Sequence, residues 1–230
     1  MPRLVLPELL DDLPPRDAAA LRSRRELRRI NAWMGHPRRM AGVLRQHWPG
    51  SRLQPLAELG AGDGYFLLSV VQRLKPDLGG ELTLVDQLDA VDPETRAQFG
   101  RLGWRVRVDI SGATPWLARA ATPPPRAIIS NLFFHQFQDA PLREMLRLAA
   151  AASRLVIALE PRRSWLSRRG GNLLWLLGCG PVTRHDARIS IHAGFTGAEL
   201  SALWPDRENW TLTERPAGWC SHLFIAKRKD

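Results

Sequence analysis

The stretch Pro55-Leu-Ala-Glu-Leu-Gly-Ala-Gly-Asp-Gly-Tyr-Phe66 decides how the rest of the chain is interpreted. Its apolar first half predicts the end of a buried strand with Glu58 at the carboxyl edge, and the apolar run from Tyr65 predicts a helix. Between them lie Gly60, Gly62 and Gly64. Glycines permit positive φ angles and a close approach of a ligand to the backbone, and a helix start offers unpaired N–H groups. The stretch therefore predicts a cofactor-binding turn.

The spacing of the glycines distinguishes this turn from two other nucleotide-binding motifs. The dinucleotide fingerprint G-x-G-x-x-G needs a glycine where this chain has Tyr65, and the phosphate loop needs a lysine that does not follow here. Glu58 and Asp63 would repel a pyrophosphate but suit a ligand with an amine and a sulfonium. The pattern E-L-G-x-G-x-G resembles motif I of the class I S-adenosylmethionine-dependent methyltransferases. The resemblance covers residues 55–227 and implies S-adenosylmethionine as the cofactor.

Acidic or polar residues also follow the later strands. The predicted strand Glu81–Asp86 ends at the spacing from which a carboxylate reaches a ribose, with Gln87 beside it. The resemblance implies that Asp109 pairs with the adenine amino group and that Ile110 packs on the ring. Ligands of parallel sheets bind at the carboxyl ends of strands, so these positions should converge. The predicted cofactor-binding residues are Glu58, Gly60, Ala61, Gly62, Gly64, Asp86, Gln87, Asp109, Ile110, Asn131 and Leu132.

The alternation of predicted strands and helices indicates the architecture. We expect an α/β protein with the Rossmann-like class I methyltransferase fold, a mostly parallel seven-stranded sheet with helices on both faces. Predicted helices include Tyr65–Leu74, Pro93–Leu102, Ala140–Ala151 and 114–121, the last followed by the stiff link Pro123–Pro125. Predicted strands include Trp104–Val108, Ala127–Ile129, Arg154–Glu160, Trp210–Glu214 and Ser221–Lys227.

The N-terminal part precedes the first strand and forms a unit of its own. Residues 1–16 hold four prolines and predict mostly irregular structure, before helices from Asp17 to Gly35 and from Pro37 to Trp48. We expect residues 1–50 to form a helical lid and residues 51–230 to form the cofactor-binding domain. The alternative is an extension that packs without touching a ligand.

The segment Arg126–Phe137 contains the first catalytic candidate. The run from Asn131 to Phe137 resembles motif IV of the small-molecule branch, in which an L-H-H-F/L turn follows strand four beside the methyl group. It lacks the N-P-P-Y or D-P-P-Y pattern of base and amide N-methyltransferases. Gln136 replaces the second histidine, so only His135 carries over. The alternative is that His135 packs beneath the cofactor and bonds the backbone.

Thr183-Arg-His-Asp186 contains the second candidate. A carboxylate beside a histidine can orient the ring and stabilise its cation, which makes the histidine a usable base. Bacterial methyltransferases with this type of motif IV carry a similar Arg-His-Asp stretch on the substrate side. The predicted catalytic residues are therefore His135, His185 and Asp186, and the predicted substrate-pocket residues are Trp33, His135, Arg184 and His185.

A further stretch combines basic and apolar halves. Pro161–Arg169 is rich in arginine, whereas Asn172–Gly178 is apolar. The stretch could lie against an anionic and apolar partner, such as a lipid surface or a carrier-bound acyl chain. The other interpretation is a pocket-lining helix with a solvated basic end.

Composition limits the partners. The net charge is +10 and lysine occurs only at 75, 227 and 229, so the charge comes almost entirely from arginine. It indicates either an acidic partner or a solvated basic surface, and nucleic acid is not favoured because RNA-stacking aromatic signatures are missing. The two cysteines predict neither a disulfide nor a metal site. With no apolar signal segment or membrane-spanning run, we predict a cytoplasmic protein.

These observations predict an enzyme that transfers a methyl group from S-adenosylmethionine to a small, partly apolar acceptor, most simply to a hydroxyl oxygen. The acceptor could be free or carrier-bound. Three alternatives remain at this point: a C-methyltransferase on a quinone or polyketide, an RNA methyltransferase, or a non-catalytic cofactor-binding protein.

Overall fold

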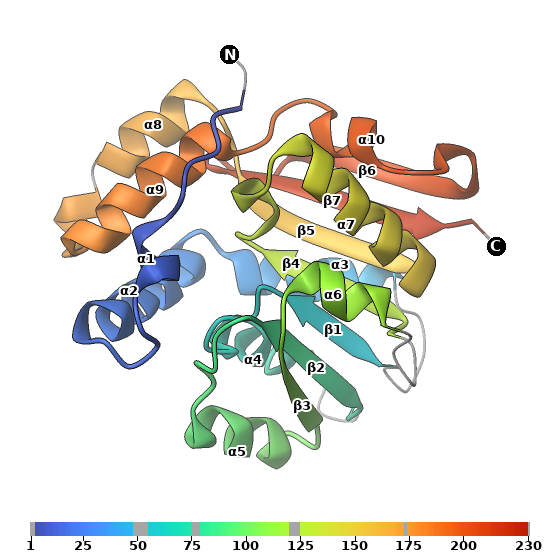
Figure 1. Cartoon of the computed structure of the whole chain (residues 1–230), viewed down its shortest axis with the longest axis horizontal. Coiled ribbons are helices and arrows are strands. Elements are labelled where there is room, and N and C mark those ends of the chain that lie inside the picture. The colour runs from blue at the N-terminus through green and yellow to red at the C-terminus, as the bar shows by residue number, and fades with distance from the viewer. Residues whose placement is uncertain (1–2, 48–54, 75–78, 120–124, 173, 230) are drawn as a thin grey trace.

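A computed structural model describes residues 3–47, 55–74, 79–119, 125–172 and 174–229. Its centre is a seven-stranded sheet in the order β3-β2-β1-β4-β5-β7-β6 (Figure 1). Strands β1 to β5 run parallel, and β7 is antiparallel to both β5 and β6. The fold class predicted from the sequence is confirmed. The strands are β1 (Leu56–Leu59), β2 (Glu81–Asp86), β3 (Arg105–Ile110), β4 (Ala127–Asn131), β5 (Leu155–Pro161), β6 (Trp210–Pro216) and β7 (Ser221–Arg228).

The central strands are buried because helices cover both faces of the sheet. On one face, side chains of β1 and β4 pack against α3 (His36–His47), α4 (Tyr65–Val71) and α5 (Pro93–Arg101). On the other face, α6 (Ala113–Ala118), α7 (Asp139–Ala152) and α10 (Glu199–Leu203) complete a second core. Strands buried on both faces have continuous apolar sequences, and β4 and β5 are buried at every position.

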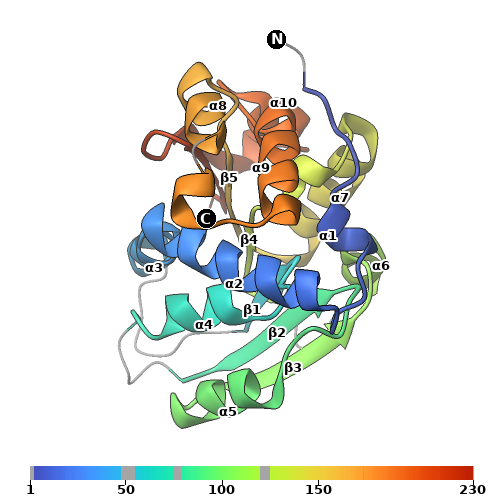
Figure 2. The same cartoon turned by 90° about the vertical axis from the view of Figure 1, so that its left-hand side faces the viewer.

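A cap lies over the carboxyl ends of β1, β4 and β5, and Figure 2 views it face on. It consists of α1 (Leu9–Asp12), α2 (Ala18–Trp33), α8 (Trp165–Asn172), α9 (Pro181–Ala193) and the short 3-10 helix η2 (Leu174–Leu177). Two further 3-10 turns are η1 (Phe134–Gln136) and η3 (Arg207–Asn209). The predicted start of α2 is confirmed, since the Asp17 carboxylate accepts a hydrogen bond from Ala19 N at 2.7 Å. The cap thus combines the N-terminal helices with elements from the last third of the chain.

The structure assigns one motif to an element. Thr183–Asp186, for which the sequence analysis predicts no helix or strand, lies inside α9. Gly180 followed by Pro181 at the first helical position was the available signal, since proline there loses no hydrogen bond. Some predicted features lie outside the described residues: Trp48, the proposed domain boundary at 50/51, residues 120–121 and Pro123–Pro124. No helix in the described ranges is long and apolar enough to cross a bilayer.

Candidate functional site

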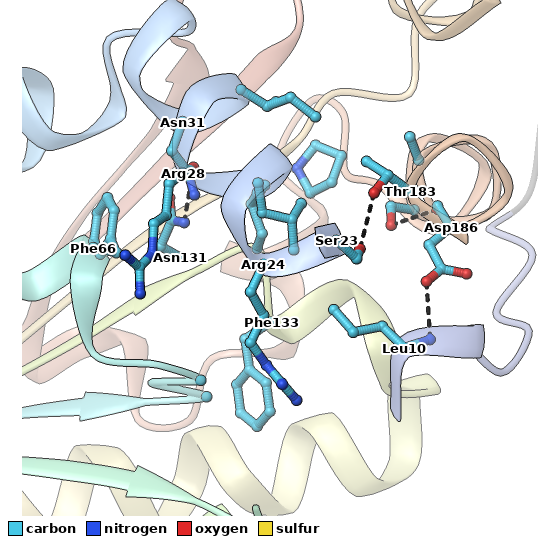
Figure 3. A pocket seen from close by; sticks show the side chains of 18 of the residues that line it. Leu10, Ser23, Arg24, Arg28, Asn31, Phe66, Asn131, Phe133, Thr183 and Asp186 are labelled. Atoms are coloured by element: carbon cyan, nitrogen blue, oxygen red, sulfur yellow. Dashed lines mark hydrogen bonds between the residues drawn. The ribbon is translucent and has the colours of Figure 1, made fainter. Parts of the chain in front are cut away.

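A cavity of about 900 Å³ lies between the sheet and the cap. Its floor is the glycine turn after β1 together with the ends of β2 and β4, and its roof comes from α1, α2, η2 and α9. Figure 3 shows Arg24 and Arg28 extending from α2 into the region of Phe133 and Asn131, with Asp186 of α9 on the right beside Leu10. This is where ligands bind in open α/β sheets.

The glycine turn is shaped by close packing on one side and open space on the other. Gly60, Gly62 and Gly64 all have positive φ angles. A Cβ atom on Gly60 would lie 2.3 Å from the Phe133 ring, and one on Gly64 would lie 2.8 Å from Leu84. At Gly62 a Cβ would meet nothing within 4 Å. The turn therefore fits tightly onto the protein at Gly60 and Gly64 and presents bare backbone to the cavity at Gly62.

Glu58 lies beneath this turn with only 1% of its surface exposed. Among the described residues, no hydrogen-bond partner reaches its Oε2 atom. Burial, and then the charges of Asp63 and Asp86, raise the pKa of this carboxyl well above its usual value. A buried carboxyl oxygen without a partner is costly, so Glu58 is a strong candidate to receive a cationic group of a ligand.

Asp86 connects the end of β2 to the glycine turn. Its Oδ2 accepts a hydrogen bond from Gly62 N at 2.8 Å, and its Oδ1 accepts one from Leu88 N at 2.9 Å. A carboxylate has about four acceptor positions, so lone pairs remain for sugar hydroxyls. Gln87 is exposed and also lines the cavity.

The predicted adenine residues lie outside the cavity lining. Hydrogen bonds from Ser111 Oγ at 2.7 Å and Arg119 at 2.9 Å engage the Asp109 carboxylate. Burial alone would raise the pKa of Asp109, but these bonds hold it below its usual value. Ile110 is exposed, and Ser111 is the neighbouring residue that lines the cavity. The roles of Asp109 and Ile110 stay predictions.

Asn131 is held by a buried histidine that the sequence does not single out. His36 Nδ1 donates to Asn131 Oδ1 at 2.7 Å, and Ser221 Oγ lies 2.6 Å from Nε2. Burial lowers the pKa of His36 to about 4, so the ring is neutral. Asn131 Nδ2 donates to Asn31 Oδ1 of α2 at 3.0 Å, a contact visible in Figure 3. The next residue, Leu132, lines the cavity with φ 54°, a left-handed conformation that costs energy for a leucine.

His135 lies in a row of buried ionisable groups. Its Nδ1 donates to Glu160 at 2.8 Å and its Nε2 donates to Glu8 at 3.2 Å. Burial opposes ionisation of the ring, but hydrogen bonds and charges of Glu160 and Glu8 raise the pKa of His135 to about 9. Glu160 also accepts backbone hydrogen bonds from residues 133–135. His135 is therefore an imidazolium held between two carboxylates at neutral pH.

Glu8 comes from the N-terminal segment, which lies along the cavity wall. Arg3 fixes one end of the segment by donating to Phe137 O at 2.9 Å and to Asp139 at 2.8 Å. Asp186 fixes the other end, since its two carboxylate oxygens accept from Leu9 N at 2.8 Å and Leu10 N at 3.0 Å. Burial raises the pKa of Glu8, but bonds from His135, Ser190 and Gln136 outweigh it and lower the pKa overall.

The residues predicted as catalytic or as substrate-pocket residues divide into two groups. His135, Trp33 and Asp186 line the cavity, whereas Arg184 and His185 do not. The ring of His185 lies 3.1 Å from Asp186 and its side chain is half exposed. The structure thus brings Asp186 to the N-terminal segment as well as to His185. In the described residues, no group of three or more His, Cys, Asp or Glu side chains could hold a metal ion.

An ion pair connects helix α2 to the glycine turn below it. Arg28 of α2 donates to Asp63 at 2.8 Å and lies over the Tyr65 ring at 4.2 Å. Glu8, His36 and Arg28 could not be found from the sequence, because each acts across at least 35 positions and none belongs to a local motif.

Several solved structures, many of them named as methyltransferases, have folds similar to that of this chain. The chain matches an O-methyltransferase family protein from Burkholderia thailandensis at 18% identity and TM-score 0.57, covering 87% of this chain and 58% of that one. It matches TnmH at 17% identity and TM-score 0.58, covering 97% and 62%. It also matches magnesium protoporphyrin IX methyltransferase (ChlM) from Synechocystis PCC 6803 with bound SAH at 13% identity and TM-score 0.53, covering 85% and 83%.

The chain has the fold of the class I S-adenosylmethionine-dependent methyltransferases. At these identities the likeness extends to the fold, and the chain spans less than two thirds of the Burkholderia protein and of TnmH. No protein-family model and no curated protein sequence matches the chain. In this methyltransferase fold, the cavity occupies the carboxyl ends of the parallel strands.

Proposed function

We propose that the protein is an S-adenosylmethionine-dependent methyltransferase acting on a small, partly apolar acceptor, most simply at a hydroxyl oxygen. The observation that carries this proposal is the buried carboxyl of Glu58, whose Oε2 atom has no hydrogen-bond partner among the described residues, beneath a glycine turn that is open at Gly62. A buried acid without a partner suits an ammonium group. Bare backbone beside it suits a ligand that must lie close to the turn.

The residues around the turn fit the parts of this cofactor. Glu58 would take the ammonium, Asp86 the ribose hydroxyls, and Gly60 to Gly62 the backbone contact. Asn131 borders the cavity at the end of β4, where His36 and Asn31 orient its amide. When bound, S-adenosylmethionine supplies an electrophilic methyl group on a sulfonium.

The acceptor side of the cavity supports an apolar substrate. Side chains of α2 and η2 line it, among them Leu27, Ile30, Leu174, Leu176 and Leu177. Phe133 and Phe137 lie below at a ring-centroid distance of 4.9 Å. Pockets that bind small molecules are typically mostly apolar with a few convergent polar groups, which here are Asn131, His135 and Glu8.

Of the two candidate histidines, we propose His135 as the base because it lines the cavity. It can accept a proton only after Glu8 has moved away and the Nε2 proton has been released to solvent, since both ring nitrogens otherwise donate to carboxylates. An acceptor hydroxyl that takes the place of Glu8 also removes one cause of the raised pKa. Glu160 then orients the ring and stabilises the imidazolium that forms, the role predicted for Asp186.

The test is turnover with S-adenosylmethionine and a panel of small hydroxylated aromatic and aliphatic compounds. We expect S-adenosylhomocysteine to form and the product NMR spectrum to show an O-methyl group. His135→Gln should lower kcat about 100-fold or more, the usual contribution of a general base. His185→Gln should have a much smaller effect because its ring is half exposed outside the cavity.

Two outcomes would overturn parts of this proposal. The cofactor assignment is wrong if calorimetry detects no binding of S-adenosylhomocysteine to the wild type and Glu58→Gln leaves turnover unchanged. If both histidine variants keep full turnover, the base assignment is wrong while the cofactor assignment stands. A C-methyl signal in the product would mean that the acceptor atom is the carbon of a carbon acid and not a hydroxyl oxygen.

A further inference from the structure

The distribution of tryptophan over the surface is uneven. Trp104, Trp116, Trp204 and Trp210 are buried in the two cores of the sheet. Another four tryptophans are more than half exposed: Trp33 at 64%, Trp165 at 62%, Trp175 at 57% and Trp219 at 75%. All four belong to the cap or to the connection between β6 and β7 beside it. Leu176 and Leu177 of η2 are exposed with them.

Four of these exposed side chains border the large cavity or the pocket next to it, and Trp165 and Trp175 come from α8 and η2 of the same cap. Trp33 lines the large cavity together with Leu176 and Leu177, and lines a second, shallow pocket together with Trp219 and Arg39. Helix α8 adjoins the same region, because a Cβ on Gly170 would lie 3.7 Å from Cys220. Figure 2 shows α8, α3 and the connection between β6 and β7 toward one side of the cap. We call the six residues Trp33, Trp165, Trp175, Leu176, Leu177 and Trp219 the tryptophan face.

The charges around the tryptophan face have one sign. Exposed arginines come from α2, α3 and α8, and include Arg22, Arg25, Arg29, Arg38, Arg39 and Arg169. The single carboxylate in α2, α3, α8 and η2 is Glu26, whose residue is 1% exposed. Glu26 is already bonded to Arg22 at 2.7 Å and to Thr183 at 2.6 Å. The outward charge of this side is therefore positive.

We propose that the tryptophan face docks on an anionic lipid bilayer. Tryptophan suits the boundary between headgroups and acyl chains because one part of its ring is apolar and its N–H is polar. Basic side chains around apolar ones add attraction to anionic headgroups. Exposed contiguous apolar surface of this kind marks an interaction site, and the positive rim selects a negatively charged partner. The binding is peripheral and does not depend on the proposed methyl transfer.

Docking in this orientation would turn the mouth of the cavity toward the bilayer. Trp33, Leu176 and Leu177 belong both to the tryptophan face and to the cavity lining. An apolar acceptor dissolved in the membrane could then pass into the cavity along apolar side chains. This consequence rests on the proposed function, whereas membrane docking itself can be tested without turnover.

The test is co-sedimentation of the full chain with mixed phosphatidylglycerol–phosphatidylcholine vesicles and with pure phosphatidylcholine vesicles. We expect binding to the mixed vesicles, a blue shift of tryptophan emission, and weaker binding as salt is raised. The double variant Trp175→Ser/Trp219→Ser should partition about tenfold or more weakly. Arg38→Gln/Arg39→Gln should weaken binding to mixed vesicles by roughly tenfold.

The matched control is Arg105→Gln/Arg143→Gln, which removes two exposed arginines from β3 and α7 and should leave vesicle binding unchanged. Melting curves check each variant, and Trp165→Ser replaces any tryptophan substitution that impairs folding. Equal binding by the tryptophan variants, or equal binding to neutral vesicles, would overturn the proposal. So would a dimer in solution that the tryptophan substitutions dissociate, since the face would then be a subunit interface.

Discussion

Gly60 and Gly62 lie two positions apart in the same turn, but Gly60 is tightly packed whereas Gly62 faces open space. Both have positive φ angles, 69° and 53°, which an alanine adopts at a cost of about 1–2 kcal/mol. At Gly60 the added methyl would also overlap the Phe133 ring, whereas at Gly62 it would point into the cavity. We therefore expect the first glycine to be needed for folding and the second to be needed for ligand binding.

This difference gives a matched pair of variants. We expect Gly60→Ala to lower the free energy of unfolding by roughly 2–4 kcal/mol, the sum of strain and overpacking. Gly62→Ala should cost only about 1–2 kcal/mol in urea unfolding but should abolish binding of S-adenosylhomocysteine in calorimetry. Full binding by a folded Gly62→Ala protein would mean that the ligand does not approach this backbone.

Among the helices and strands, α9 holds the N-terminal segment in place through hydrogen bonds. The Asp186 carboxylate bonds two backbone amides of α1, and α1 follows directly after Glu8. We expect Asp186→Ala to release the segment, so that hydrogen exchange of the Leu9 and Leu10 amides becomes faster. The pKa of His135, about 9 with Glu8 in place, should fall as well, which NMR titration of the ring would measure.

A control separates this effect from general loosening of the cap. Asp12→Ala changes an exposed residue of the same short helix and should leave both the exchange rates and the His135 titration as they are. Asp186→Ala could free the two amides without changing the pKa of His135. In that case Asp186 does not hold Glu8 beside the His135 ring.

The elements that could be predicted from the sequence are those with local signals. The apolar run before the glycines, the apolar run that ends in Asp86 and the apolar β5 each predict a strand, and the mostly parallel seven-stranded sheet follows from the alternation of strands and helices and from the family resemblance. The contacts of His135 could not be predicted, because residues 1–16 have no periodic pattern and Glu8 lies 127 positions away. Likewise His36 gives no signal in sequence, since its role depends on Asn131 and Ser221 meeting around it.

The stability of the whole molecule should depend on pH through Glu58. Its pKa is 4.5 when unperturbed and well above that in the folded protein, so the folded state holds a proton that the unfolded chain releases. Such a group contributes its stability fully below the unfolded pKa and loses it as pH rises through the folded value. A tenfold difference in acidity between the two states corresponds to about 1.4 kcal/mol.

Glu58→Gln removes this ionisation while keeping the size of the side chain. We therefore expect the variant to gain stability relative to the wild type as pH rises from about 5 to 8, because only the wild type must expose or ionise a buried acid. Urea unfolding at several pH values measures the difference. Glu81→Gln, a change at an exposed glutamate on β2, should follow the wild-type curve. If the Glu58→Gln curve runs parallel to the wild type instead, the carboxyl is already ionised in the folded protein, and some group of the protein must neutralise it before any ligand arrives.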